Sequence, residues 1–227
     1  MTEEELLTLL KKRSITARLH GKGVDNLIER DDGFPGLFMP PSRQRKSAIF
    51  LRTGRTVRKT LFTLCHELGH FWAYATNRRT DSYELALRRQ QVWESAIALK
   101  VHNTESILEY AKPSEAPKEV YSKALADAER DKPNPLSEDD RQEILAEEVR
   151  AWCFGMKIAK ALGVADTDAF CAEANTALGN YYQRLKLPCA EWAPTNCNCN
   201  LAVEDERFVL ELAAPDAIVT GSAKAED

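Results

Sequence analysis

Hydrophobic residues along residues 56–76 recur with the period of an α-helix. They follow one another at steps of three and four: Val57, Leu61, Leu64, Leu68, Phe71 and Ala75. This spacing places them on one stripe of a helix. His66 and His70 point almost opposite that stripe, among small residues where a surface helix would carry charged ones. The segment therefore predicts a helix that runs through the middle of a domain and is enclosed on both faces.

Similar patterns predict helices along most of the chain. Thr2 with Glu5 is typical of a capping box and predicts a short first helix over about residues 3–12. Residues 21–47 are rich in Gly, Pro and Asp, which predicts a loop or an irregular hairpin. The apolar run AIFLR at 48–52 suits a strand. We expect further helices over residues 83–110, from about 137 to 163, and over 166–186.

Together these elements predict an α+β fold that is mainly helical and has a small sheet. A single domain would cover residues 1–200, and residues 201–227 would form a C-terminal extension that is partly disordered. Within the domain, residues 112–136 carry four prolines around a polar stretch. This composition predicts a solvated insertion with one exposed helix.

Composition limits the ligands and the cellular location that we expect for this domain. The chain has 227 residues and a net charge of −4, so we expect no nucleic acid as a direct ligand. No apolar run approaches the roughly 20 residues of a membrane span. The acidic start MTEEELLTLLKK does not have the character of an export signal, and the six cysteines follow no disulfide framework. We therefore expect a cytoplasmic protein without a membrane partner.

The predicted central helix contains the sequence HELGH, which is typical of a catalytic zinc site. Residues four apart share a helix face, so His66 and His70 can bind one Zn²⁺. Glu67, one step round the helix, would lie beside the metal and act as the general base that takes a proton from water. The sequence has only four histidines, which makes a chance match of this motif rare. Catalytic zinc sites have three protein ligands, so a third ligand is required.

Three glutamates on later helices are candidates for the third ligand. Glu148 has apolar or small helical neighbours, so its carboxylate should point into the core, where a divalent metal would balance its charge. Glu147 is one step round and faces more polar neighbours, where it would support the ligands or lie on the surface. Glu94 follows soon after the motif, next to polar residues. His20 and His102 stand in no recognisable ligand context.

Two segments resemble a known family. SAIFLRTGRTVRKTLFTLCHELGH resembles the active-site region of the ImmA/IrrE metallo-endopeptidases, in which an apolar strand precedes the motif. EEVRAWCFGMKIAKALGV is similar to the helix that carries the third zinc ligand in that family, and to a segment of the peptidase domain of ArdC-like antirestriction proteins. The two regions cover about residues 46–76 and 143–163. Arg150 replaces the asparagine of the family pattern, and the DNA-binding domain of ArdC-like proteins has no visible counterpart.

The resemblance implies a zincin-like fold of the minimal gluzincin type, with Glu67 as the general base. It implies three zinc ligands: His66, His70 and Glu148. The interval between the motif and Glu148 is longer than is usual in the family, so Glu94 and Glu147 stay open as alternatives.

These features predict a zinc-dependent endopeptidase whose substrate is a protein, by analogy with the family a regulator or repressor. AIFLR would be the edge strand above the metal, where an extended peptide pairs by β-addition. A nearby phenol or imidazole would stabilise the oxyanion, and five are candidates: Tyr83, Tyr110, His102, Tyr181 and Tyr182. The alternative function is a non-proteolytic, zinc-stabilised module that binds protein or DNA, as an antirestriction factor would. A metal-free helical interaction protein is a third hypothesis.

Overall fold

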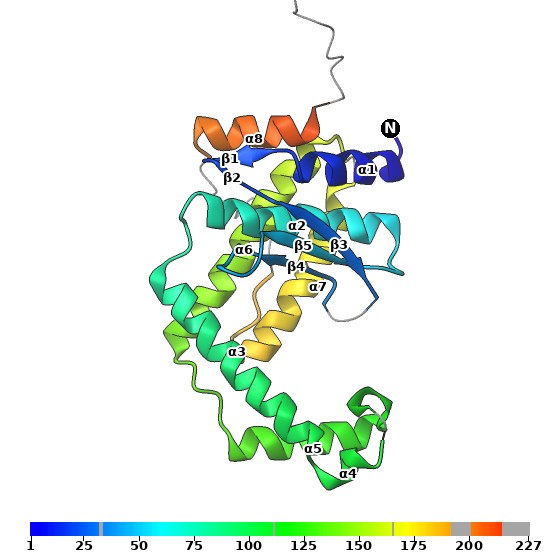
Figure 1. The fold of residues 1–227 in the computed structure, drawn as a ribbon, viewed down its shortest axis with the longest axis vertical. Coiled ribbons are helices and arrows are strands. Elements are labelled where there is room, and N and C mark those ends of the chain that lie inside the picture. The colour runs from blue at the N-terminus through cyan, green and yellow to red at the C-terminus, as the bar shows by residue number, and fades with distance from the viewer. Residues whose placement is uncertain (32–33, 111, 165, 192–200, 215–227) are drawn as a thin grey trace, which may run out of the picture. The chain divides into compact units, whose positions relative to one another are not determined.

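The computed structural model describes residues 1–31, 34–110, 112–164, 166–191 and 201–214 (Figure 1). Its helices are α1 (Glu3–Ser14), α2 (Val57–Ala75), α3 (Asp81–His102), α4 (Glu105–Leu108), α5 (Lys118–Asp131), α6 (Glu138–Ala161), α7 (Thr167–Leu185), α8 (Val203–Ala213) and the short 3₁₀-helix η1 (Pro113–Glu115). Its strands are β1 (Arg18–Leu19), β2 (Lys22–Gly23), β3 (Asn26–Arg30), β4 (Gly36–Met39) and β5 (Ala48–Arg52). The predicted α+β class with a helical majority is confirmed.

The contacts divide the chain into two units. The first consists of Met1–Arg78 with Glu147–Asp227, and the second consists of Arg79–Ala146. Helix α6 begins in the second unit and ends in the first. The predicted insertion at residues 112–136 lies within the second unit.

The first unit contains a three-stranded sheet in the order β3-β5-β4. Strand β5 pairs in parallel with β3 and antiparallel with β4. The strand predicted at AIFLR is confirmed, but its assignment as the edge strand is wrong, because β5 is central and β4 is an edge. Residues 21–47, predicted as a loop or irregular hairpin, supply the strands on either side of it. Their frequent Gly, Pro and Asp residues concealed these short strands in the sequence.

Helix α2 is the buried centre of the first unit. It begins and ends where the sequence predicted, and the Thr56 side chain caps it by accepting a hydrogen bond from the Lys59 amide. All residues from 61 to 73 are buried, which confirms a helix enclosed on both faces. Strands β4 and β5 and helix α1 pack against it (Figure 1).

Two glycines let α2 and α6 approach each other closely. A Cβ on Gly69 would lie 2.2 Å from the carbonyl oxygen of Ala151, and one on Gly155 would lie 2.9 Å from the carbonyl oxygen of Cys65. Side chains at either position would hold the backbones apart, since carbon and oxygen atoms do not approach this closely. The small residues beside the histidines therefore make room for a second helix.

The terminal helices α1 and α8 pack together in the first unit (Figure 1). The capping box of α1 is confirmed, with the Thr2 side chain accepting from the Glu5 amide. Helix α8 was not predicted, although Phe208 on it is buried against the rings of Phe71 and Phe154. Its contacts are with residues far away in the sequence. The predicted disordered tail at the C-terminus lies outside the described residues.

The second unit has a small core of its own. The helix predicted over residues 83–110 is interrupted, because α3 ends at His102 and α4 begins at Glu105. Helix α5 is the one predicted within the polar stretch, and it buries Ala124 and Ala128. These alanines share a core with residues of α3 and α4: Ile97, Val101 and Ile107. The helix is therefore packed along one face.

Two further findings bear on the expected setting of the protein. In the part of the chain that the structure describes, no helix has the length and apolar character to cross a membrane. Cys65, Cys171 and Cys189 are free, whereas Cys153 is disulfide-bonded. The scattered spacing of the cysteines did not predict this bond.

Candidate metal centre

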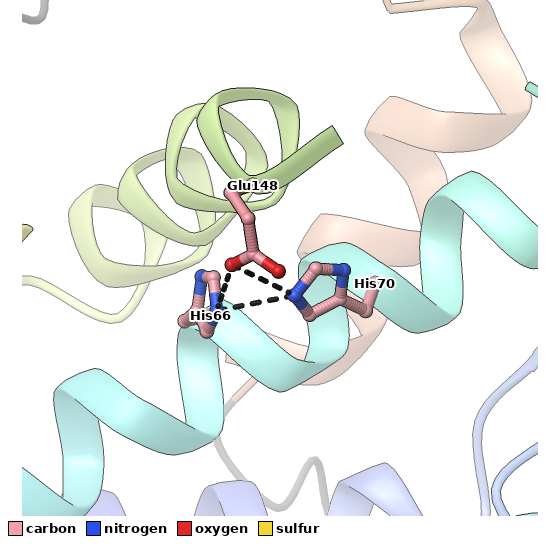
Figure 2. Close-up of side chains that lie close together, drawn as sticks. All are labelled: His66, His70 and Glu148. Carbon is pink, nitrogen blue, oxygen red and sulfur yellow. Dashed lines mark hydrogen bonds and ion pairs between the residues drawn. The ribbon is translucent and has the colours of Figure 1, made fainter. Parts of the chain in front are cut away.

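Three side chains predicted as metal ligands converge on one point. His66 and His70 project from α2 and Glu148 projects from α6 (Figure 2). The Nε2 atoms of the two histidines are 3.1 Å apart, and Glu148 Oε2 is 3.4 Å from Nε2 of His66 and 3.5 Å from Nε2 of His70. Ligand atoms bound tetrahedrally at 2.0–2.1 Å would be about 3.3 Å from one another. The three distances are therefore compatible with a shared metal ion.

Helical geometry and close helix packing explain this convergence. The two histidines lie four residues apart, so their rings project from one face of α2. Glu148 lies three residues before Ala151, where Gly69 lets the two helices touch. His66, His70 and Glu148 are all buried. A search of the described residues for His, Cys, Asp and Glu side chains spaced closely enough to hold one metal ion gives this group of three.

The charges at the site favour a buried ion pair in the metal-free protein. Burial acts to lower the pKa of His70, but the carboxylates of Glu148 and Glu147 outweigh it and raise this pKa to about 10. Burial acts to raise the pKa of Glu148, yet the two imidazoles hold it well below its usual value. A bound cation would replace the proton of His70 as the partner of this carboxylate.

Glu67 lies on the same helix and is also buried. Its Oε2 accepts a hydrogen bond of 2.7 Å from the Phe38 amide of strand β4. Burial raises the pKa of Glu67, while the neighbouring histidines partly offset the effect. Gly36 permits this close approach, since a Cβ there would lie 2.5 Å from Glu67 Oε1. The predicted general base is thus held between the histidines and an edge strand.

An aromatic ring packs against the imidazole of His66. The imidazole stacks on Trp152 with ring centroids 4.3 Å apart and an interplanar angle of 25°. Trp152 itself packs edge-on against Phe170 of α7. Its stacking on a candidate ligand arises from the α2–α6 contact and could not be read from local spacing.

The two alternative third ligands lie in different surroundings. Glu147 is fully buried, with Oε1 3.5 Å from His70 Nδ1. It contacts the side of the ring that faces away from His66 and Glu148. Glu94 belongs to α3 in the second unit, where its Oε1 accepts a hydrogen bond from Gln90 Nε2. Only Glu148 joins the two histidines in the candidate group.

The other histidines lie elsewhere. His20 forms an exposed ion pair with Glu204, with Nδ1 3.1 Å from Oε2. His102 is exposed at the end of α3.

One of the five predicted oxyanion candidates contacts the site. Tyr181 on α7 lies near Glu148, so that this carboxylate acts on its phenol. Burial raises the pKa of Tyr181 well above its usual value, and the charge of Glu148 adds to this effect, so the phenol keeps its proton. Tyr182 is the next residue on α7, and Tyr83, Tyr110 and His102 belong to the second unit.

Comparison with known proteins identifies no relative of this chain. No protein-family model matches the chain, and searches of curated proteins and of solved structures found no significant match.

Proposed function

We propose that this protein is a zinc-dependent endopeptidase of the ImmA/IrrE type, with a zincin-like fold. One observation carries the proposal: two histidines and a glutamate converge at ligand spacing beside Glu67 of the same HELGH helix. The expected substrate is a protein, and the resemblance to that family suggests a regulator or repressor. The sequence motif and the tertiary convergence support the same chemistry independently.

Zinc fits the donor set of the site. Two imidazole nitrogens and one carboxylate oxygen are a ligand combination that zinc adopts in hydrolytic enzymes. A buried carboxylate such as Glu148 needs a cation, and the site places two imidazole rings beside it whose nitrogens can bind a metal once His70 gives up its extra proton. In such a site zinc acts as a Lewis acid that makes water nucleophilic near neutral pH.

Glu67 would move the proton in the reaction. It takes a proton from the attacking water as the water oxygen bonds to the peptide carbon. It then gives this proton to the leaving nitrogen as the C–N bond breaks, while the second proton of the water stays on the new carboxyl group, so that the two products are a carboxylic acid and an amine. Its raised pKa suits the first half of this transfer, because a stronger base accepts the proton of the water more readily.

Strand β4 would present the substrate. Its residue Phe38 bonds to Glu67 on one side of the site, and β4 lies at an edge of the sheet. An extended peptide that pairs with this edge would run past Glu67 and bring a carbonyl group to the metal ligands. The predicted role of an edge strand thus passes from β5 to β4.

Tyr181 would stabilise the charge that develops on the carbonyl oxygen. Its hydroxyl already lies at Glu148 and stays protonated. A phenol that can turn from Glu148 to the carbonyl oxygen is a suitable donor for an oxyanion.

Substitution of Glu67 tests the proposed function. Wild-type protein and the Glu67→Gln variant would be assayed for bound zinc by elemental analysis and for cleavage of a peptide library by mass spectrometry. We expect both proteins to hold one zinc per chain. Cleavage should fall by about 10²–10⁴ in the variant, the usual contribution of a general base. Equal cleavage by the two proteins, or a wild type without zinc, would contradict the proposal.

One observation favours the non-proteolytic alternative. The bond from Phe38 to Glu67 ties α2 to the sheet, which is a structural role for the glutamate. In a zinc-stabilised binding module, Glu67→Gln would lower stability without removing any activity, because no cleavage would be seen in the wild type. The same assay therefore separates the two functions.

A further inference from the structure

We propose that Glu147 is the positioning residue of His70, which keeps the ring proton on Nδ1 and leaves Nε2 for the metal. The inference rests on the metal site of the proposed function and is independent of peptidase activity. It gives a role to a glutamate that the sequence left as a competing ligand or a surface residue.

The position of the carboxylate carries the argument. The side chain of Glu147 is 0% exposed, and its Oε1 is 3.5 Å from Nδ1 of His70. The other nitrogen of this ring, Nε2, is the atom that faces His66 and Glu148. A carboxylate beside Nδ1 favours a proton there, because N–H can donate to it and a bare lone pair would be repelled. The tautomer that remains has its lone pair on the metal side.

Arg150 makes this buried charge tolerable. Its Nε is 3.3 Å from Glu147 Oε2, one helical turn along α6, so each oxygen of the carboxylate has its own partner. A buried carboxylate without a cation would be costly. Arg150, at the position where the pattern that this helix resembles has asparagine, supplies that cation.

The other histidine ligand is held differently. Within the described part of the chain, the carboxylate contact of His66 is made by its Nε2 with Glu148, and its buried Nδ1 has no counterpart of the Glu147 contact of His70. The ring is instead stacked on Trp152. Loss of Glu147 should therefore disturb one ligand and spare the other, which provides an internal control.

The test compares zinc affinity in Glu147→Leu, Glu147→Gln and the double variant Glu147→Leu/Arg150→Leu. Affinity would be measured by competition with a chromophoric chelator, and folding of each metal-free protein by thermal unfolding. We expect Glu147→Leu to weaken zinc binding by about 10–100-fold, the usual effect of losing such a partner. The loss of zinc affinity should be smaller in Glu147→Gln, because the amide oxygen of glutamine can still accept a hydrogen bond from Nδ1 of His70.

The double variant separates positioning from stability. Replacing both members of a buried ion pair by apolar residues is often neutral for folding. Weak zinc binding in a stable double variant would support the proposal. Nitrogen NMR of the imidazoles should show a changed Nδ1 signal for His70 and an unchanged one for His66.

Wild-type affinity in a folded Glu147→Leu or double variant would overturn the inference and leave the proposed function standing. A wild type that binds no zinc would overturn both.

Discussion

A Cβ atom on Gly69 would lie 2.2 Å from the carbonyl oxygen of Ala151. This contact between α2 and α6 lies one residue from His70 and three residues from Glu148. It is the point at which two helices far apart in the sequence bring their ligands together. The geometry of the candidate metal centre therefore depends on a residue that has no side chain.

Gly69→Ala should lower both stability and zinc affinity. Alanine in a helix gains about 1 kcal/mol over glycine, but overpacking of a close contact costs about 1–3 kcal/mol, and the approach here is very short. Gly179 on α7 is the matched control, since a Cβ there meets nothing within 4 Å. We expect Gly179→Ala to be neutral or stabilising in denaturant unfolding. Stabilisation by both substitutions would contradict the proposed contact.

Glu148→Ala should remove most of the bound zinc, whereas Glu94→Ala should leave it unchanged. Glu148 lies at ligand distance from both histidines, while Glu94 bonds to Gln90 in the second unit. Elemental analysis of dialysed protein would measure the zinc per chain. Loss of zinc from the Glu94 variant alone would reverse the assignment of the third ligand.

Zinc binding should release about one proton near pH 7. The pKa of His70 in the metal-free protein is about 10, so its ring carries two protons at neutral pH and must lose the one on Nε2. Titration calorimetry in buffers of different ionisation enthalpy would count the released protons. The apparent affinity should rise with pH up to about 10, and a pH-independent affinity would contradict the buried ion pair.

The metal-free protein should lose stability as the pH rises from about 6.5 towards 10. Over this range the folded chain keeps the proton of His70 and the unfolded chain does not, because the folded pKa is raised from 6.5. The stabilisation that protonated His70 contributes is fully present below 6.5, the pKa of this side chain in the unfolded chain. The pKa of Glu148 is lowered instead of raised, so the stability that its carboxylate contributes is lost only under acidic conditions. Thermal unfolding in chelator at several pH values would measure the trend, and excess zinc should suppress it.

Tyr181→Phe should reduce turnover more than substrate binding. If its hydroxyl stabilises the oxyanion, the loss in kcat should be about 10²–10³, with bound zinc unchanged. Tyr182→Phe is the control, because this residue is one step, about 100°, further round α7. Equal kcat for the Tyr181 variant and the wild type would exclude the role, whereas equal losses in both variants would indicate a general effect on α7.

Local periodicity was sufficient for most of the helices, although not for α8, and for the candidate site residues on α2. The bounds of α2 and the shared face of His66 and His70, with Glu67 one step round, follow from a repeat of 3.6 residues, which acts between near neighbours. The apolar neighbours of Glu148 likewise indicated that its carboxylate points inwards. For the same reason the capping box of α1 could be read directly from Thr2 and Glu5.

Contacts between distant segments were decided by the tertiary structure. The sequence did not reveal that β4 lies beside Glu67, that β5 is central, or that α8 packs against α1. It also left Glu147 and Tyr181 among several alternatives. Strand pairing and helix crossing depend on which surfaces meet, and a one-dimensional pattern records only which side of an element is apolar. The sequence by itself thus determined the helix that carries the candidate metal ligands His66 and His70, and only the packing of α6, α7 and β4 against it determined the surroundings of that site.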